Sequence, residues 1–261
     1  MTSTRFYQCL AEAEAPLIAE IKPSSPKVGP LLAERSVKEI ARDYADAGAA
    51  CLSVTTGRWH RGSIAMIAAM ALTGLPVLRK DFITTRQDLE ISKQAGASAV
   101  LLTCKLIRRQ DILRLSDMAL SLGLTPFVEA ASAQELAGLT LPYGAILAVN
   151  NRDIRQQETD DGGIEQSARL FDQARQAHPG LLVSASGLLR PQDLRHARQI
   201  GFDGGLVGTA LLSGPGSARE TTAAFVRAAC LSPNCLSPVG HSPADLSPTC
   251  RTQDLTQKEL M

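Results

Sequence analysis

The chain has 261 residues, of which 44% are hydrophobic and 4% are aromatic, and its formal net charge at pH 7 is +1. This length suits one large domain or two small ones, and it can bury a core without metal or disulfide staples. The balance of 27 Lys and Arg against 26 Asp and Glu lacks the basic excess of a nucleic-acid binder. Any attraction for an anionic ligand must therefore come from a local site.

Targeting and membrane signals are missing from the sequence. The N-terminal residues contain no apolar core of a signal peptide, and the longest apolar stretch, 64–72, is too short to cross a bilayer. Six cysteines in this length do not make a disulfide scaffold, and Cys51 and Cys104 lie in apolar runs typical of small buried residues. We therefore expect a cytoplasmic protein with no membrane or nucleic-acid partner, as a monomer or a weak homo-oligomer.

Short apolar runs recur along the chain and are separated by amphipathic segments. Each run is almost continuously apolar, as expected for parallel strands that are covered on both faces. The runs are 17–21, 50–54, 76–78, 99–102, 125–128, 145–149, 181–184 and 204–207. Eight alternating units predict an α/β fold, a single (β/α)8 TIM barrel, because a doubly wound sheet more often has fewer strands.

The segments between the runs carry helix signals. Ser36 and Glu39 have the spacing of a capping box, in which each residue's side chain binds the backbone N–H of the other. Ile164, Ala168 and Phe171 recur at helical spacing and predict another helix whose apolar face they form. These helices are expected to cover the outside of the barrel.

The composition changes near the C-terminus. Residues 230–261 contain repeated Ser-Pro pairs among Gly, Asn and Asp, which excludes regular helix and leaves few apolar residues for a core. We interpret 1–229 as the barrel domain and 230–261 as a disordered tail. Cys230, Cys235, His241 and Cys250 lie in this tail, but no two cysteines have the Cys-x2-Cys spacing of a zinc site, so no metal is expected.

Polar residues follow several strands, where barrels of this type carry their chemistry. Side chains alternate faces along a strand, so Glu20 and Lys22 share one face of the first run. Lys80 ends the third run, Glu129 the fifth and Asn150 the sixth. A structural ion pair could explain the first two alone, but the whole set offers general acids and bases whose properties burial can tune.

The last two units carry glycine-rich turns. The seventh run leads into Ser186 and Gly187, and the eighth into Gly208 and Thr209. Glycine lets backbone N–H groups approach an anion, and the loops after strands seven and eight are the usual phosphate site of such barrels. The turns therefore predict a phosphate cradle, although tight turns alone would also use glycine.

Five segments together resemble the indole-3-glycerol-phosphate synthase family, in order and at family spacing over about residues 16–228. They are IAEIKPSSP (18–26), PVLRKDFI (76–83), GASAVLL (96–102), VNNRD (149–153) and LVG (206–208). The resemblance implies a carboxy-lyase of tryptophan biosynthesis. Its substrate would be 1-(2-carboxyphenylamino)-1-deoxyribulose 5-phosphate, whose pyrrole ring closes with loss of carbon dioxide and water, and no cofactor would be needed.

The same resemblance implies catalytic roles for four residues. Lys80 would be the general acid that protonates the departing oxygen, and Glu129 would handle the proton of the dehydration step. Glu20 and Asn150 would organise the site.

It also implies the residues that would hold the substrate. Lys22 would bind the substrate carboxylate and Phe82 would border its aromatic ring. The other substrate contacts would be Ser25, Arg152 and Ser186, and the phosphate would be bound by Gly187, Gly208 and Thr209.

Three features depart from the family pattern. Ala185 stands where the family usually has a glutamate after strand seven, so one carboxylate is missing. Thr56 and His60 replace a glutamate and an aromatic residue after strand two. About 16 residues precede the first run, which is too few for the family's helical extension over the barrel mouth.

Two other functions stay open on these observations. One is a diverged paralogue that acts on another phosphorylated substrate, and the other is a barrel that binds an anion without catalysis. Retention of the acid/base set favours catalysis, whereas Ala185 and the short N-terminal segment favour the alternatives. Phosphoribosylanthranilate isomerase, a related barrel, fits less well because no cysteine lies near the end of the first run.

Overall fold

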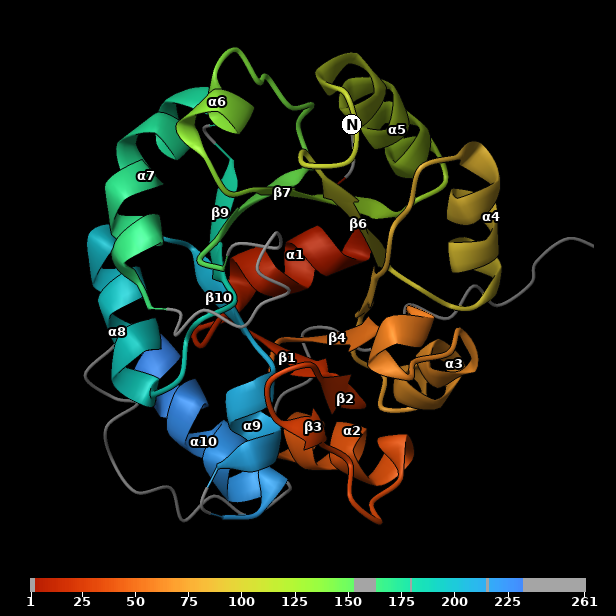
Figure 1. Cartoon of the computed structure of the whole chain (residues 1–261), viewed down its shortest axis with the longest axis vertical. Coiled ribbons are helices and arrows are strands. Elements are labelled where there is room, and N and C mark those ends of the chain that lie inside the picture. The colour runs from red at the N-terminus through yellow and green to blue at the C-terminus, as the bar shows by residue number, and fades with distance from the viewer. Residues whose placement is uncertain (1–2, 153–162, 179, 215, 232–261) are drawn as a thin grey trace, which may run out of the picture.

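A closed barrel of parallel strands organises the chain. The computed structural model describes residues 3–152, 163–178, 180–214 and 216–231. Around the barrel the strands follow the order β1-β10-β9-β8-β7-β6-β5-β4, and β4 pairs with β1 to close the ring. Helices surround this ring on its outer side (Figure 1). The predicted (β/α)8 TIM barrel is confirmed.

Each predicted apolar run coincides with one barrel strand, and the ends differ by at most two residues. The barrel strands are β1 (Leu17–Ile21), β4 (Cys51–Thr55), β5 (Val77–Lys80), β6 (Ala99–Thr103), β7 (Thr125–Ala130), β8 (Ile146–Asn150), β9 (Leu181–Ala185) and β10 (Gly204–Val207). A short antiparallel hairpin, β2 (Ser24–Ser25) and β3 (Gly29–Pro30), follows β1 and was not predicted.

Helices connect the strands in the described ranges. They are α1 (Arg5–Glu12), α2 (Val37–Asp46), α3 (Ala65–Ala71), α4 (Arg86–Gln94), α5 (Arg109–Ser121), α6 (Ala133–Leu136), α7 (Glu165–Ala177), α8 (Pro191–Ile200), α9 (Thr209–Ser213) and α10 (Ala218–Ala229). A 3-10 turn, η1 (Arg58–His60), follows β4. In none of these helices are length and hydropathy sufficient to span a membrane.

Helix signals in the sequence were right about position and partly wrong about face. The capping box of Ser36 and Glu39 is formed, with the Ser36 N–H donating to Glu39 Oε2 at 2.8 Å. In α7, however, Ala168 is exposed, and the buried face is formed by Ser167, Leu170 and Ala174. The small alanine contributed little to the predicted stripe, so the true face could not be distinguished from its neighbour.

Alternate residues of the strands form two separate cores. Ala19 and Ile21 belong to the outer core, between the strands and the helices. Ile18, Leu78 and Phe127 belong to the inner core, which fills the barrel. The alternation predicted for β1 is therefore confirmed, and it directs Glu20, two residues beyond Ile18, into the barrel.

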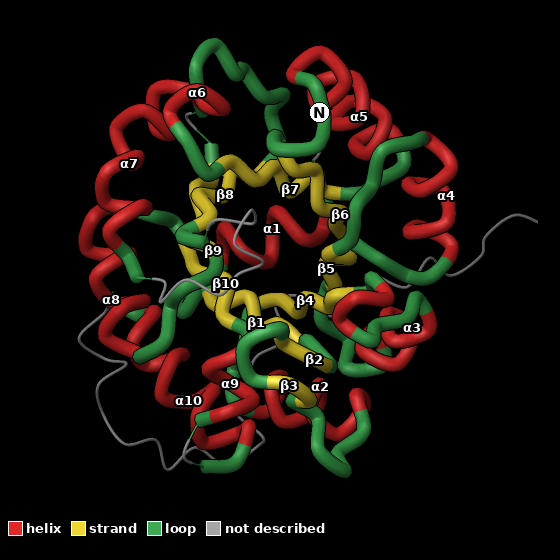
Figure 2. The backbone as a smooth tube through the Cα atoms, viewed as in Figure 1, coloured by secondary structure: helices red, strands yellow, loops and turns green. Residues whose placement is uncertain are grey.

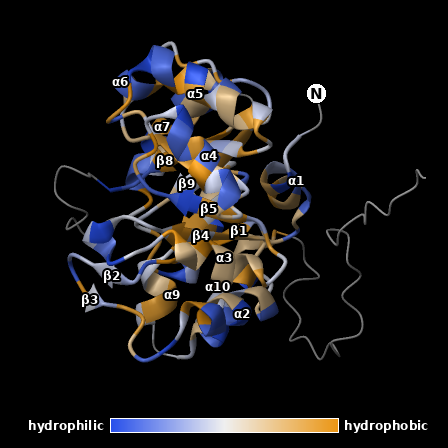
Figure 3. Cartoon of the chain, turned by 90° about the vertical axis from the view of Figure 1, so that its right-hand side faces the viewer, coloured by the Kyte–Doolittle hydropathy of each residue, from blue (hydrophilic) through white to orange (hydrophobic). Residues whose placement is uncertain are grey.

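Helix α1 closes the N-terminal end of the barrel. Its Phe6 and Leu10 are 0% and 1% exposed and belong to the inner core. Figure 2 shows α1 across the ring of strands, and Figure 3 shows it at the opposite end from the β2–β3 hairpin. From the sequence, this segment is expected only to be too short for an extension over the barrel mouth. In the structure it closes the opposite end, and we call it the floor of the barrel.

The predicted domain boundary lies close to the end of α10 at Ala229. Residues 232–261 are outside the described residues, as are Cys235, His241 and Cys250. The interpretation of 230–261 as a disordered tail therefore stays a prediction.

The floor should contribute strongly to stability. Phe6→Ala removes a fully buried ring from the inner core, and we expect the free energy of unfolding to fall by about 3–5 kcal/mol. Leu72→Ala, at a side chain that is 72% exposed, should change it by less than about 0.5 kcal/mol. Urea denaturation measures both, and equal losses in the two variants would contradict the role of α1.

Candidate active site

A layer of buried polar side chains lies above the inner core at the carboxyl ends of the strands. It contains Glu20, Lys22, Lys80, Glu129, Asn150 and Arg152, and none of these residues is more than 8% exposed. They come from, or directly follow, β1, β5, β7 and β8. The structure thus brings together in one layer the residues that the sequence predicted from separate strand ends.

Glu20 and Lys80 form an ion pair within this layer. Lys80 Nζ lies 3.5 Å from Glu20 Oε2, and the side chains are 9% and 3% exposed. Ser53, which is paired with Glu20 between β4 and β1, donates to the same Oε2 at 3.5 Å. The sequence placed Glu20 beside Lys22, whereas the structure joins it to a lysine from β5, with β4 between the two strands.

Asn150 connects Glu129 to the loop after β8. Its Nδ2 donates to Glu129 Oε1 at 3.0 Å, and its Oδ1 accepts from the Arg152 backbone N–H at 2.9 Å. Both ends of the amide are therefore fixed, which also fixes the position of one Glu129 carboxylate oxygen. Such an arrangement suits a base that must face a bound substrate.

The charge of the layer is positive. Lys22, Lys80 and Arg152 contribute three positive charges, and Glu20 and Glu129 contribute two negative ones, which leaves +1. Arg79 is also buried but forms a separate ion pair with Asp81, at 3.1 Å. Because electrostatic interactions are stronger where water is excluded, this excess favours an anionic ligand.

Ala185 occupies an inner position of the same layer. It is 0% exposed, belongs to the inner core, and is paired with Asn150 of β8 and Leu206 of β10. A carboxylate here would therefore have pointed into the site, and a methyl group takes its place. The carboxylate that the sequence analysis found missing is therefore missing from the site itself.

Asn151 was not predicted as a site residue, yet it connects the turn after β9 to the first turn of α7. Its Nδ2 donates to Ser184 Oγ at 3.0 Å and to the carbonyl oxygens of Ala185 and Ser186 at 3.2 and 3.0 Å. Its Oδ1 accepts from the backbone N–H of Ser167 at 2.8 Å. One side chain thus fixes the turn after β9 against the start of α7.

The turn after β9 has the backbone conformation of an anion cradle. Ser186 and Gly187 have φ angles of 62° and 69°, in the left-handed region that a residue other than glycine rarely adopts. Successive residues of this kind can direct backbone N–H groups toward one point. A Cβ on Gly187 would lie 2.9 Å from the Gly163 nitrogen, so this position also lacks room for a side chain.

Gly208 brings the second turn against the acid/base layer. A Cβ at Gly208 would lie 2.7 Å from Glu20 Oε1, which explains glycine at this position without any need for an unusual φ. Thr209 begins α9 directly after it. The two turns therefore lie beside Glu20, at one edge of the buried layer.

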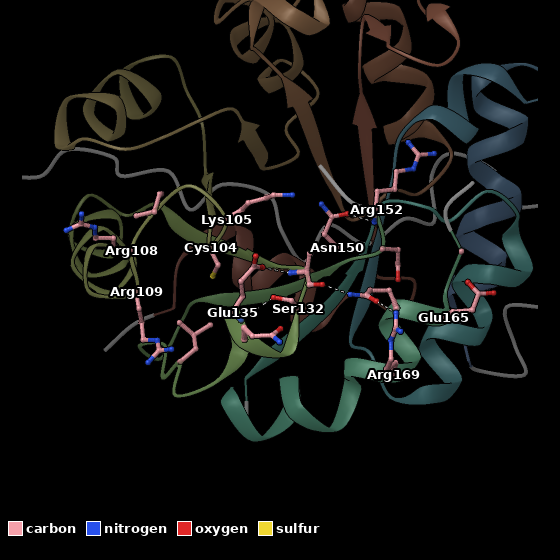
Figure 4. A pocket seen from close by; sticks show the side chains of 17 residues that line it. Cys104, Lys105, Arg108, Arg109, Ser132, Glu135, Asn150, Arg152, Glu165 and Arg169 are labelled. Atoms are coloured by element: carbon pink, nitrogen blue, oxygen red, sulfur yellow. Dashed lines mark hydrogen bonds between the residues drawn. The ribbon is translucent and has the colours of Figure 1, made fainter. Parts of the chain in front are cut away.

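Two hollows open at the mouth and meet at Arg152. The smaller hollow lies between the two turns and part of the buried layer. The residues that line it include Glu20, Lys22, Arg152, Ser186, Gly187, Gly208 and Thr209. The larger, of about 920 Å³, is lined by residues that include Lys105, Glu135, Asn150 and Arg152. In Figure 4 the Lys105 side chain extends toward Asn150 and Arg152.

Two predicted substrate contacts lie outside these hollows. Ser25 is buried in the β2–β3 hairpin, and Phe82 is 43% exposed after β5. Phe82 stacks on Trp59 of η1, with ring centroids 4.6 Å apart. His60, which replaces a family aromatic residue, is turned away to the hairpin, where its Nδ1 lies 3.0 Å from the Ser24 carbonyl oxygen.

Cys104, next to the larger hollow, is not suited to nucleophilic catalysis. Burial raises the pKa of its thiol to about 12, with Glu135 and Glu129 adding to the effect and Arg109 opposing it. The thiol therefore stays protonated at neutral pH. Among the described residues, no group of three or more His, Cys, Asp and Glu side chains could hold a metal ion.

The role of Asn151 can be tested through stability. Asn151→Asp would place a carboxylate oxygen against the carbonyl oxygens of Ala185 and Ser186. Because the donor is lost and the acceptors stay buried, we expect the free energy of unfolding to fall by about 1–3 kcal/mol. Exposed Gln192 is the control, and a loss no larger than that of Gln192→Glu would contradict this role.

Comparison with known families gives a match over most of the chain. A family model described as indole-3-glycerol phosphate synthase matches residues 1–224. A protein of that name from Thermococcus kodakarensis is 38% identical over 201 residues, 76% of this chain and 87% of the relative. Another, from Pyrococcus abyssi, is 37% identical over 212 residues, 80% of this chain and 90% of the relative.

Solved structures share the fold at low sequence identity. A crystal structure of tryptophan synthase from M. tuberculosis, in an open form, has a TM-score of 0.65 and 12% identity, covering 88% of this chain and 100% of that one. A structure titled native KDPGal has a TM-score of 0.52 and 18% identity, covering 82% and 93%. At these identities the likeness supports the barrel alone.

Proposed function

Because the chain belongs to the indole-3-glycerol-phosphate synthase family, we propose that it is a carboxy-lyase that closes the pyrrole ring of 1-(2-carboxyphenylamino)-1-deoxyribulose 5-phosphate. The observation that carries this proposal is the buried layer with a net charge of +1 beside two glycine turns. A substrate with a carboxylate at one end and a phosphate at the other matches both parts.

The first step of the reaction needs a general acid. The ring carbon that bears the carboxylate attacks the ketose carbonyl, and negative charge develops on the carbonyl oxygen as the C–C bond forms. Lys80 would donate a proton to this oxygen, and Glu20, 3.5 Å away, would hold the ammonium group in place. Cleavage of the bond to carbon dioxide then restores the aromatic ring.

The second step needs a base. Lys80 takes up a proton from solvent and donates it to the hydroxyl formed from the carbonyl, which leaves as water while the neighbouring methylene carbon loses a proton. Glu129 would take that proton, since Asn150 holds its carboxylate at 3.0 Å. All of these groups are protein side chains, so the reaction is proposed without a cofactor or a metal.

The remaining site residues would hold the substrate. Lys22 would bind the carboxylate, and Gly187, Gly208 and Thr209 would bind the phosphate through backbone N–H groups. Further contacts are proposed for Ser25, Phe82, Arg152 and Ser186. A small phosphorylated substrate is thus the proposed partner, and the cytoplasmic location and the monomeric or weakly oligomeric state stay predictions.

Ala185 supports a second candidate function. A methyl group at this buried position leaves more room and one negative charge fewer than the family glutamate. A diverged enzyme for another phosphorylated substrate would use this space. The rest of the acid/base layer is present, however, so ring closure is the function that we propose.

Removal of the proposed acid should abolish most of the activity. We expect Lys80→Ala to lower kcat by at least about 10²-fold, the usual scale for general acid catalysis, with a smaller change in KM. The assay follows the fluorescence of the indole product. Lys38→Ala, at an exposed lysine of α2, is the control, and near-normal turnover of Lys80→Ala would remove Lys80 from the mechanism.

Restoring the missing carboxylate separates the two functions. If the chain closes the ring, Ala185→Glu should keep kcat/KM on the family substrate or raise it, and a tenfold gain corresponds to about 1.4 kcal/mol of transition-state stabilisation. Ala185→Gln, which has similar size without charge, is the matched control. If the wild type and Ala185→Glu both fold but neither turns over this substrate, the synthase proposal is wrong and the second function is favoured.

A further inference from the structure

A buried threonine hydroxyl lies in the acid/base layer without a hydrogen-bond partner among the described residues. Thr55, the last residue of β4, is 3% exposed, and its Oγ1 is neither bonded nor accessible to water. A buried polar group that is left unpaired destabilises the folded protein, so such a group needs an explanation. The proposed reaction does not use this hydroxyl.

Alternation along β4 directs Thr55 into the barrel. Cys51 belongs to the inner core and Ser53 donates to the carboxylate of Glu20, so both of these β4 residues face inward. The residues between and after them belong to the outer core. Thr55 comes two residues after Ser53 and therefore faces inward as well, one step closer to the mouth.

Lys80 lies beside Thr55 in the sheet. The two residues are paired in the register of β4 and β5, and neighbouring strands lie about 4.8 Å apart. Both side chains face inward, since Leu78, two residues before Lys80, belongs to the inner core. Lys80 reaches Glu20 on β1, and β4 lies between these two strands. The lysine side chain therefore passes over the inner face of β4, where Thr55 lies.

In the structure the charged lysine does not use this hydroxyl. Lys80 Nζ lies 3.5 Å from Glu20 Oε2, whereas Thr55 Oγ1 accepts and donates no hydrogen bond among the described residues. A lysine that has given up a proton is different, because its nitrogen carries a lone pair that accepts a hydrogen bond. The carboxylate of Glu20 is an acceptor only and cannot donate to this lone pair, but a hydroxyl can.

The charged groups of the mouth come from strands other than β4. They are Glu20 and Lys22 at the end of β1, Lys105 after β6, Glu129 on β7 and Arg152 after β8. Arg79 and Asp81, on either side of Lys80 in the chain, pair with each other at 3.1 Å. On β4, the Ser53 hydroxyl already donates to Glu20. Thr55 therefore carries the β4 hydroxyl that stays available to the lysine.

We propose that Thr55 is a positioning residue for the general acid: its hydroxyl donates a hydrogen bond to Lys80 Nζ after that group has protonated the substrate oxygen. Solvent then supplies the proton that restores the ammonium group, and Thr55 itself neither gains nor loses a proton. This inference rests on the proposed function for the role of Lys80. A hydrogen bond that favours the neutral form of the lysine also makes its proton easier to donate.

Reductive methylation tests this contact without any substrate, because formaldehyde reacts with the neutral form of an amine. At about pH 8, we expect Lys80 to be methylated about three- to tenfold more slowly in Thr55→Val, since one hydrogen bond to the neutral form is lost. Thr55→Ser, which keeps the hydroxyl, should react at nearly the wild-type rate. Mass spectrometry of the Lys80 peptide gives the rate, and exposed Lys38 is the internal control. Equal rates at Lys80 in the wild type and Thr55→Val would overturn the proposal.

Kinetics tests whether the contact serves the reaction. We expect Thr55→Val to lower kcat about three- to tenfold with KM within about twofold, and Thr55→Ser to keep both constants near those of the wild type. Thr222→Val makes the same change at a buried threonine of α10 and should alter neither constant. Unchanged kcat in Thr55→Val would overturn the proposal. A loss in Thr55→Ser as large as that in Thr55→Val would also overturn it, because it would show a role in packing.

Thermal unfolding adds a readout that separates this role from a structural one. The melting temperature of Thr55→Val should stay the same or rise, because the hydroxyl that is removed has no partner in the resting protein. A lower melting temperature would show that the hydroxyl stabilises the fold, and it would overturn the proposal.

The two proposals fail in different ways. If the folded wild type does not turn over the family substrate, the proposed function fails, and the methylation rates still decide whether Thr55 acts on Lys80. If turnover is normal but Thr55→Val matches the wild type in methylation and in kcat, the role of Thr55 is wrong and the proposed function stands.

Discussion

The ion pair between Lys80 and Glu20 is the interaction on which the site depends. A charged group that is removed from water without a partner costs several kcal/mol, so each side chain of the pair offsets part of the burial cost of the other. The pair joins β1 and β5 across the interior at 3.5 Å. It keeps an ammonium group inside the barrel mouth, where a proton can be delivered to a substrate that excludes water.

The rest of the barrel supports this pair from below. Ile18, Leu78 and Phe127 form an apolar layer, and two residues further along the same strands come Glu20, Lys80 and Glu129. Because side chains alternate between the two faces of a strand, the next inward-facing residue beyond the apolar core on each of these strands is charged. Helix α1 closes the other end, so water is excluded from the core side as well.

Ala185 affects the formal charge of the layer as well as its shape. With a glutamate at this position the formal charge would be zero, and with alanine it is +1. A more positive layer is consistent with a substrate that carries two anionic groups, so the missing carboxylate does not by itself argue against binding.

Sequence reasoning predicted which residues face the mouth but not which of them touch. Alternation along β1 directed Glu20 inward, and the neighbour in sequence, Lys22, was the obvious partner. The contact with Lys80 depends on the curvature of the closed barrel, which no local pattern contains. Asn151 was missed for a similar reason, since its four hydrogen bonds join segments that lie far apart in the chain.

The missed features are short elements whose stability comes from packing. Helix α1 has eight residues, and only Phe6 and Leu10 are buried, so its apolar pattern is too brief to recognise. The strands, in contrast, are continuous apolar runs, and their ends were predicted to within two residues.

The proposed function requires that this buried layer closes the ring and removes the carboxylate in one active site. The most direct measurement follows carbon dioxide and indole product together, with wild-type protein, the carboxyphenylamino-deoxyribulose phosphate and a metal chelator. We expect many turnovers with one carbon dioxide released per indole product. No turnover by the folded protein, or release of carbon dioxide without an indole product, would contradict it.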